Sequence, residues 1–133
     1  MIPFTSGHRY FVYSGIVDFR KGYNGLSGVV KSNMESNPFN GDIYIFFNKR
    51  NNQIRMLVYD SGGLVILSKR LEKGTFENNK SESLHAKINI TWTQLMCIMQ
   101  GIKLSSIRYK KRYQGFEKIN KNIAKLLLHI AKY

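Results

Sequence analysis

Three apolar runs separated by two turn signals occupy residues 42–76 and predict a three-stranded antiparallel meander. In the first run, residues 43–47, both alternating sets of side chains are apolar, which predicts a central or doubly covered strand. The Asn-rich connection at residues 48–52 is typical of a hairpin turn. We expect this stretch to organise the rest of the fold.

The second and third runs complete the predicted meander. In the second run, Arg55 lies among apolar positions and marks a strand face that reaches water at least in part. The glycines within residues 60–63 can adopt positive φ, which predicts a tight turn. A third strand is expected over residues 64–67, and it is followed by the basic pair Lys69 and Arg70.

Upstream of the meander, the sequence predicts one strand and one helix. The strand covers residues 9–13 and is expected to lie beside the meander. Asp18 is the predicted N-cap of a helix over residues 19–34, because apolar side chains recur there at three- and four-residue spacing. Three glycines inside this segment cost roughly 1 kcal/mol each relative to Ala. They indicate either close packing against a neighbouring element or a shorter helix.

Downstream, alternation over residues 84–90 predicts a half-buried strand. Thr91 and Gln94 fit the capping-box pattern for a short helix over residues 92–100. A second helix is expected over about residues 117–131, with an apolar face opposite a lysine-rich face. We interpret that apolar face as closing the core or a dimer interface, although membrane-surface and partner-docking helices show the same pattern.

These elements predict the fold class as α+β: one domain, a small antiparallel β-meander sheet with packed helices, and a basic C-terminal helix. A chain of 133 residues with 43% hydrophobic residues suits one domain with a real core. We expect residues 1–104 to form this core domain and residues 105–133 to form a basic arm with an amphipathic helix.

Cysteine content and hydropathy limit the cross-links, metal sites and cellular locations expected for this protein. The single cysteine, Cys97, excludes an internal disulfide and any zinc site built from several cysteines. No apolar run approaches the length of a membrane span, and the first ten residues lack the apolar centre of a signal peptide. We therefore expect a cytoplasmic protein, with nucleoid association possible, and no membrane partner.

The charge of the chain points to a polyanionic partner. Twenty-one Lys and Arg residues against eight Asp and Glu residues give a formal net charge of +13. Residues 105–133 hold eight of the basic residues and one of the acidic residues, so over half of the excess lies in the predicted arm. The competing interpretation is charge that serves only solubility.

Catalytic and metal chemistry find little support in the sequence, so we predict no catalytic residues, no metal and no cofactor. A metal-dependent nuclease needs several carboxylates that converge on one or two ions. The candidates each have a plainer interpretation as a helix cap, a turn residue or the partner of a neighbouring basic residue; they are Asp18, Asp42, Asp60 and Glu72. The three histidines are isolated, and no phosphate-binding or dinucleotide-binding glycine motif is present.

Three separated blocks resemble one known family in order and spacing. They are DFRKGYNGL at residues 18–26, NPFNGDIYIFFNKR with VYDSGG and KRLEKGTF within residues 37–76, and ITWTQLMCIMQGI at residues 90–102. The chain resembles the TnpB-type accessory proteins of the insertion sequence sixty-six family, which differ from the RNA-guided nucleases of the same name. The resemblance covers about residues 1–104. It implies an accessory factor that assists transposition by a separate DDE transposase.

The sequence therefore predicts a non-catalytic DNA-binding accessory factor. Phosphate contacts from basic side chains would supply affinity, and tyrosines placed among basic residues could stack on exposed bases. The predicted nucleic-acid-binding residues are Arg20, Lys21, Lys49, Arg50, Arg55, Lys69, Arg70, Arg108, Tyr109, Lys110, Lys111, Arg112 and Tyr113. Expected partners are DNA of the element ends or target and the separate transposase, with a homodimer possible. The alternative is a protein-interaction module that contacts the transposase without binding DNA.

Overall fold

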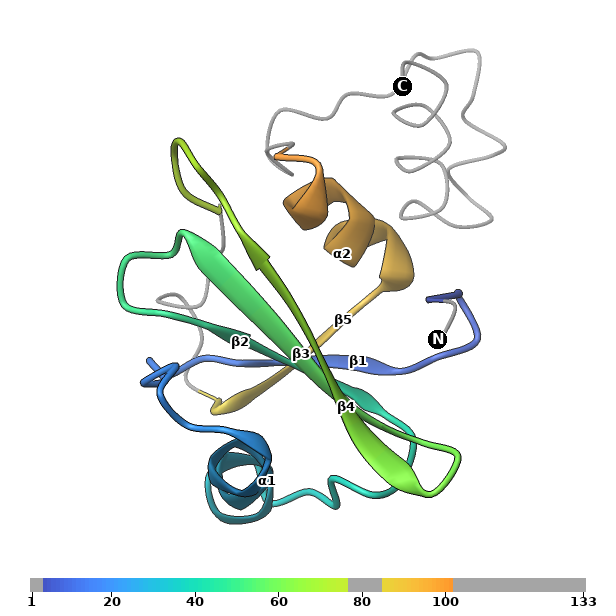
Figure 1. Cartoon of the computed structure of the whole chain (residues 1–133). Coiled ribbons are helices and arrows are strands. Elements are labelled where there is room, and N and C mark those ends of the chain that lie inside the picture. The colour runs from blue at the N-terminus through green and yellow to red at the C-terminus, as the bar shows by residue number, and fades with distance from the viewer. Residues whose placement is uncertain (1–3, 77–84, 102–133) are drawn as a thin grey trace, which may run out of the picture.

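The computed structural model describes residues 4–76 and 85–101, which form one five-stranded sheet with a helix on each face (Figure 1). The strand order is β4-β3-β2-β1-β5. In chain order the elements are β1 (Tyr10–Tyr13), α1 (Tyr23–Ser32), β2 (Ile43–Phe47), β3 (Gln53–Asp60), β4 (Gly63–Arg70), β5 (Lys87–Ile90) and α2 (Trp92–Met99). The predicted α+β class is confirmed.

Strands β2, β3 and β4 form the predicted antiparallel meander. Ile45 lies opposite Met56, which in turn lies opposite Leu67. All five residues of β2 are buried, as expected for a central strand with apolar side chains on both faces. The β3–β4 turn is tight because Ser61 and Gly62 both adopt positive φ, at 48° and 87°.

The N-terminal strand β1 joins the sheet between β2 and β5, and it runs parallel to β2. Tyr10 lies opposite Ile43 on one side and opposite Ile90 on the other. Parallel neighbours need a long crossover, and the segment that carries α1 supplies it. The sheet is therefore mixed, since the β1–β2 pair departs from the antiparallel arrangement that the sequence predicted.

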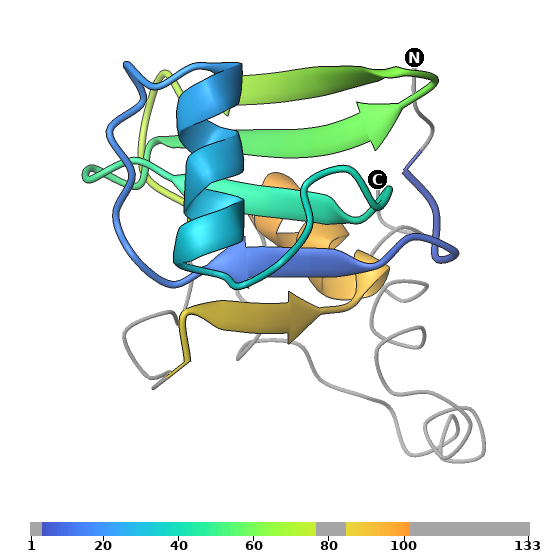
Figure 2. The same cartoon turned by 90° about the horizontal axis from the view of Figure 1, so that it is seen from below.

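Each face of the sheet carries its own hydrophobic core, because successive strand residues point to opposite faces. Helix α1 covers one face and α2 lies behind the other (Figure 2). The core under α1 consists of Phe11, Val17, Leu26, Val30, Met34, Tyr44, Phe46 and Leu57. The core under α2 consists of Tyr10, Val12, Ile43, Ile45, Phe47, Ile54, Met56, Val58, Phe76, Leu95 and Ile98.

Helix α1 begins at Tyr23, so the longer helix with Asp18 as its N-cap was wrong and the shorter alternative is confirmed. The N-cap is Gly22, and no side chain caps it. The Asp18 carboxylate instead accepts a hydrogen bond from the backbone N–H of Arg20 at 2.9 Å, which closes a short turn over residues 18–20. Because this turn forms at residues 18–20, the helix begins only at Tyr23.

Helix α2 begins where the capping box predicted. The Thr91 side chain accepts from the backbone N–H of Gln94 at 3.1 Å, and the Gln94 side chain accepts from the Thr91 N–H at 2.9 Å. Gly101 follows the helix with a φ of 76°. The predicted arm at residues 105–133, with its second helix, lies outside the described residues.

Candidate nucleic-acid interface

Basic side chains gather at one end of the sheet, where β2 and β4 end and β3 begins. Lys49 and Arg50 occupy the exposed tip of the β2–β3 hairpin. The tip is fixed from inside, because the Asn48 Oδ1 accepts from the backbone N–H groups of residues 52 and 53 at 3.1 and 3.0 Å. Arg70 ends β4 directly opposite the first residue of β3, so it lies beside this hairpin.

Arg55 brings a second segment to the same end of the sheet. Its guanidinium Nη1 donates to the backbone carbonyl of Phe19 at 2.7 Å and to that of Lys21 at 3.1 Å. The guanidinium carbon also lies 4.7 Å from the Phe19 ring centroid, within cation–π range. Arg55 is thus committed to holding the segment that precedes α1, and this segment presents Arg20 and Lys21 to solvent.

Lys21 is further positioned by Gly25 in the first turn of α1. A Cβ atom at residue 25 would lie only 2.6 Å from the Lys21 Cβ and 2.9 Å from its Cγ. Glycine therefore allows the aliphatic stem of Lys21 to lie against the helix. This contact lies within one segment of the chain, and a Cβ atom at Gly22 or Gly28 would meet nothing within 4 Å, so these glycines do not mark close packing against a neighbouring element.

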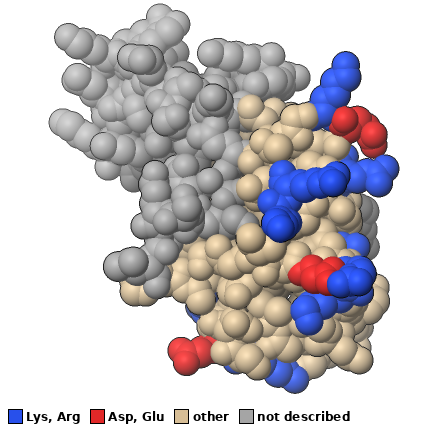
Figure 3. Space-filling view, turned by 90° about the vertical axis from the view of Figure 1, so that its left-hand side faces the viewer, with Lys and Arg blue, Asp and Glu red and all other residues tan. Residues whose placement is uncertain are grey.

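We call the exposed group Arg20, Lys21, Lys49, Arg50 and Arg70 the basic end. Figure 3 views the molecule from the side where the β2–β3 hairpin projects, and Lys and Arg side chains outnumber acidic ones there. Two members have acidic partners: Arg20 lies 2.6 Å from Asp18, and Arg70 lies 3.6 Å from Glu72. The other three members form no ion pair with a described residue. A net positive surface remains.

The Asp18–Arg20 pair keeps its charge over the whole physiological range. Hydrogen bonds from the Arg20 side chain and backbone lower the pKa of the Asp18 carboxyl to about 2. Both side chains are exposed, at 47% and 91% of their surface, so water screens the pair. Arg20 consequently contributes less net positive potential than Lys21 or the hairpin tip.

Lys69 lies apart from the basic end, on the face of the sheet that α2 covers. Its ammonium donates to the backbone carbonyl of Met99 at 2.9 Å, at the C-terminal end of α2. A cation at that end of a helix is favourable because the last carbonyls lack intrahelical partners. Among the basic residues that the structure describes, the five of the basic end therefore gather at an end of the sheet instead of lining one of its faces, and Lys69 lies apart from them.

The sequence did not single out Lys73 as a basic-end neighbour. The backbone N–H of Leu71 donates to Asn52 O at 2.7 Å, and that of Phe76 donates to Asn51 O at 2.6 Å. These bonds hold the loop that carries the exposed Lys73 against the hairpin. A local sequence pattern could not predict these bonds, because they connect backbone atoms of residues 51 and 52 with those of residues 71 and 76, on either side of the β3–β4 hairpin.

Six predicted binding residues belong to the arm beyond residue 104, and they lie outside the described residues. They are Arg108, Tyr109, Lys110, Lys111, Arg112 and Tyr113. Their contribution to an interface stays a prediction.

The candidate acidic residues do not converge. Asp18 lies at the basic end, whereas Asp60 ends β3 at the opposite end of the sheet. Asp42 accepts a bidentate pair of hydrogen bonds from Arg9, and Glu72 lies beside Arg70. Among residues 4–76 and 85–101, no three His, Cys, Asp or Glu side chains come together in a group able to hold a metal ion.

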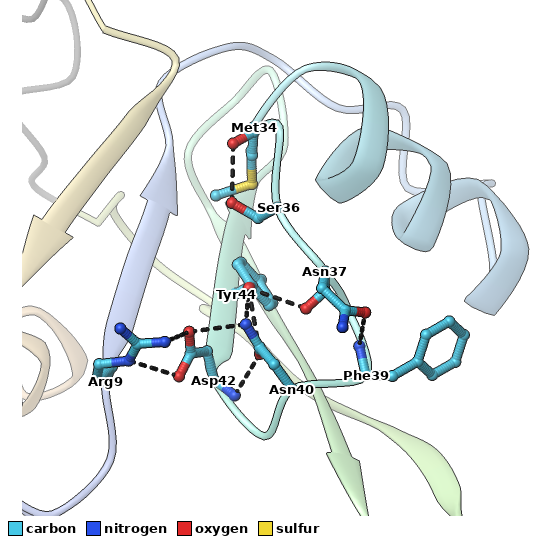
Figure 4. A network of polar contacts seen from close by, with 8 residues as sticks. All are labelled: Arg9, Met34, Ser36, Asn37, Phe39, Asn40, Asp42 and Tyr44. Atoms are coloured by element: carbon cyan, nitrogen blue, oxygen red, sulfur yellow. Dashed lines mark hydrogen bonds and ion pairs between the residues drawn. The ribbon is translucent and has the colours of Figure 1, made fainter.

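Asp42 belongs to a polar network at the end of the sheet remote from the hairpin tip (Figure 4). Arg9 donates to its two carboxylate oxygens at 2.9 and 2.6 Å, and the Asn40 amide donates to it at 3.0 Å. The Tyr44 hydroxyl donates to Asn37 O at 3.1 Å. The hydrogen bond to Asp42 raises the pKa of Arg9, and burial raises the pKa of Tyr44. The network explains Asp42 as a structural residue that fixes the loop before β2.

The comparison with protein families shows which family the chain belongs to. The model of the family described as IS66 Orf2 like protein matches residues 8–109. The chain belongs to the IS66 Orf2-like family. It is therefore a transposition-associated accessory protein, as the resemblance of its three sequence blocks predicted. No solved structure matches the chain.

Two relatives come from Sinorhizobium fredii (strain NBRC 101917 / NGR234). Uncharacterized protein y4jC is 40% identical over 76 residues, which cover 57% of this chain and 65% of that protein. Uncharacterized protein y4hO is 26% identical over 102 residues, which cover 77% of this chain and 87% of that protein. The chain thus spans slightly less than two thirds of the length of y4jC.

The part of the IS66 Orf2-like chain that the structure describes has no helix both long and apolar enough to cross a membrane. Its longest helix, α1, has ten residues and is partly polar.

Proposed function

We propose that this IS66 Orf2-like protein binds DNA through its basic end, and that it assists a separate transposase without catalysing the reaction itself. The observation that carries the proposal is the convergence of Arg20, Lys21, Lys49, Arg50 and Arg70, which come from three separate segments of the chain. Solubility alone does not require such a convergence.

The geometry favours contact with the phosphate backbone over readout of bases. The hairpin tip and the segment before α1 present flexible basic side chains on fixed backbones. Such side chains neutralise phosphates and release counterions, so affinity falls steeply with salt and depends little on sequence. Recognition of a particular element end would then come from the transposase or from the arm.

The absence of catalysis is inferred from the placement of the carboxylates. Each of the four candidate acids is either engaged by a basic side chain or placed in an exposed turn, and Asp18 and Asp60 lie at opposite ends of the sheet. Strand cleavage with divalent metal ions requires converging carboxylates. We therefore assign bond breakage and joining to the transposase.

Fluorescence anisotropy with labelled duplex DNA, at low and at moderate salt, tests the proposal. We expect Lys49→Glu to weaken binding by roughly three- to tenfold and to lower the slope of log affinity against log salt by about 1. Lys31→Glu is the matched control, because it makes the same charge change in the last turn of α1. No binding by the intact chain at low salt would reject the proposal and favour the protein-interaction alternative.

The contribution of the arm is separated by a second pair of variants. Lys49→Ala with Arg50→Ala and Lys110→Ala with Lys111→Ala remove the same charge from the hairpin tip and from the arm. If only the arm pair weakens binding, the basic end is not the interface. Incubation of the protein with supercoiled plasmid and Mg²⁺ or Mn²⁺ tests the non-catalytic assignment, and nicking would contradict it.

A further inference from the structure

Strand β4 leaves one edge of the sheet open among the described residues. It is the outermost strand, it has eight residues, and its antiparallel pairing with β3 runs from Gly63 to Arg70. In such a pair, alternate residues direct their backbone N–H and C=O groups away from the partner strand. No described segment accepts or donates hydrogen bonds along this outer side. A row of polar backbone groups is therefore available to another strand.

The side chains of β4 distinguish it from an ordinary protected edge. Four consecutive aliphatic residues, Leu64 to Leu67, are each half-buried. Val65 and Leu67 pack against the core under α2, while Leu64 and Ile66 pack against the core under α1. Apolar surface is thus left on both faces of the edge. A strand added alongside β4 would cover both of these surfaces at once.

The opposite edge of the sheet shows the contrast. Strand β5 has only four residues, and Lys87 and Asn89 interrupt its apolar side chains. Short edge strands and charged side chains are how natural sheets discourage edge-to-edge pairing. The first five residues of β4 contain neither proline nor charge, and its basic pair lies at its last two positions. Protection of this kind is missing from most of β4.

We propose that β4 is a dimerisation edge, at which two copies of this chain pair antiparallel through a two-fold axis at Ile66. The inference is independent of DNA binding. In this register Val65 faces Leu67 of the second copy, and Leu64 faces Ser68. Apolar side chains meet near the axis, and the sheet continues from one copy into the other with both α1 helices on the same face.

Charge complementarity is the reason for choosing a second copy as the occupant. In this register Lys69 of one copy lies opposite Gly63 of the other, and glycine has no side chain to obstruct it. Within each copy, Asp60 on β3 lies directly opposite Gly63 on β4. Asp60 of the second copy therefore lies one strand beyond its Gly63, on the same face of the sheet as Lys69 of the first copy. Two strand spacings of about 4.8 Å separate the two Cα positions, a span that an extended lysine and an aspartate can bridge. In the dimer the Lys69 ammonium would exchange its hydrogen bond to the Met99 carbonyl for an ion pair with Asp60 of the second copy. Like charges do not face each other.

The test measures molar mass by light scattering on the eluting full-length protein over a range of concentrations, without DNA. We expect the intact chain to form a dimer of twice its 15.4-kDa mass. Ile66→Lys and Ile66→Glu should each abolish the dimer, because like charges then meet across the axis. Ile16→Lys is the control: the same substitution at a 64% exposed position outside β4 should leave the dimer intact.

Mixing the two Ile66 variants separates loss of the interface from loss of folding. The introduced lysine and glutamate would face each other across the axis, so an equimolar mixture should regain a dimer that neither variant forms alone. A monomeric intact chain at all concentrations overturns the proposal, as does persistence of the dimer in both variants. Failure of the mixture, with both variants folded by circular dichroism, also overturns it and favours a strand of another protein as occupant.

Discussion

The guanidinium of Arg55, near the start of β3, donates a hydrogen bond of 2.7 Å to the backbone carbonyl of Phe19, thirty-six residues earlier in the chain. The same guanidinium lies over the Phe19 ring. This contact fixes the segment before α1 on the sheet. Arg55 thus supports the basic end from beneath instead of adding to its exposed charge.

Replacing Arg55 should therefore affect stability first. We expect Arg55→Ala to lower the free energy of unfolding by about 1.5–3 kcal/mol, because two backbone carbonyls lose a charged donor. Urea denaturation followed by circular dichroism measures the change. The control is Arg20→Ala, which removes an exposed guanidinium and should change stability little. Equal stability losses in the two variants would contradict the structural role of Arg55.

Asp42 should be more important for stability than any other ion-paired acid of the described chain. Its side chain is 8% exposed and accepts from Arg9 and Asn40. We expect Asp42→Ala to lower the free energy of unfolding by about 1–3 kcal/mol, since these donors lose their acceptor. Glu72→Ala provides the comparison, because that side chain is 84% exposed and should cost little. Thermal unfolding of the two variants would distinguish these outcomes.

Alkaline pH should destabilise the protein through Tyr10. Burial raises the pKa of its hydroxyl from 10.0 to about 12, and the hydroxyl donates to Thr5 O at 2.7 Å. The unfolded chain therefore loses this proton before the folded chain does. The stabilisation is fully present below pH 10 and declines as the pH rises through about 12. Ultraviolet titration of phenolate should show a late component that Tyr10→Phe reduces, with the remainder from Tyr44, whose pKa is also raised by burial.

The β3–β4 turn offers a stabilising substitution. Ser61 adopts a φ of 48° and is followed by Gly62 at 87°, the pattern of a two-residue hairpin turn that favours Asn-Gly. We expect Ser61→Asn to raise the free energy of unfolding by roughly 0.5 kcal/mol, because asparagine tolerates this conformation better than serine. Ser61→Val should have the opposite effect. Denaturant midpoints would report both, and a loss on Ser61→Asn would argue against the turn geometry.

The sequence predicted those features whose causes are local. Apolar side chains at every position identified β2, because a strand buried on both faces leaves no polar position, and alternating apolar side chains identified β3. Thr91 and Gln94 identified the start of α2, because both capping partners lie within one turn. Membership of the family followed from three blocks whose order and spacing agree with the matched region.

Most of the features that escaped prediction depend on contacts between distant segments. The later start of α1 is the exception, because it follows from the local turn that Asp18 closes, which competes with a helix of similar local preference. Parallel pairing of β1 with β2 follows from the crossover that carries α1. The contact of Arg55 with the segment before α1 and the nearness of Lys73 to the hairpin arise only when the sheet has formed.

The place of β1 between β2 and β5 has a consequence for how the chain can be divided. Strand β5 and the helix that follows it are joined to the meander within the sheet only through β1. A fragment that starts after residue 13 would therefore lose one strand together with its pairings to both β2 and β5. Strand β5 would then have no paired neighbour in the described sheet, and α2 alone would connect this end of the chain to the meander, through the Lys69–Met99 hydrogen bond and the packing of Leu95 and Ile98.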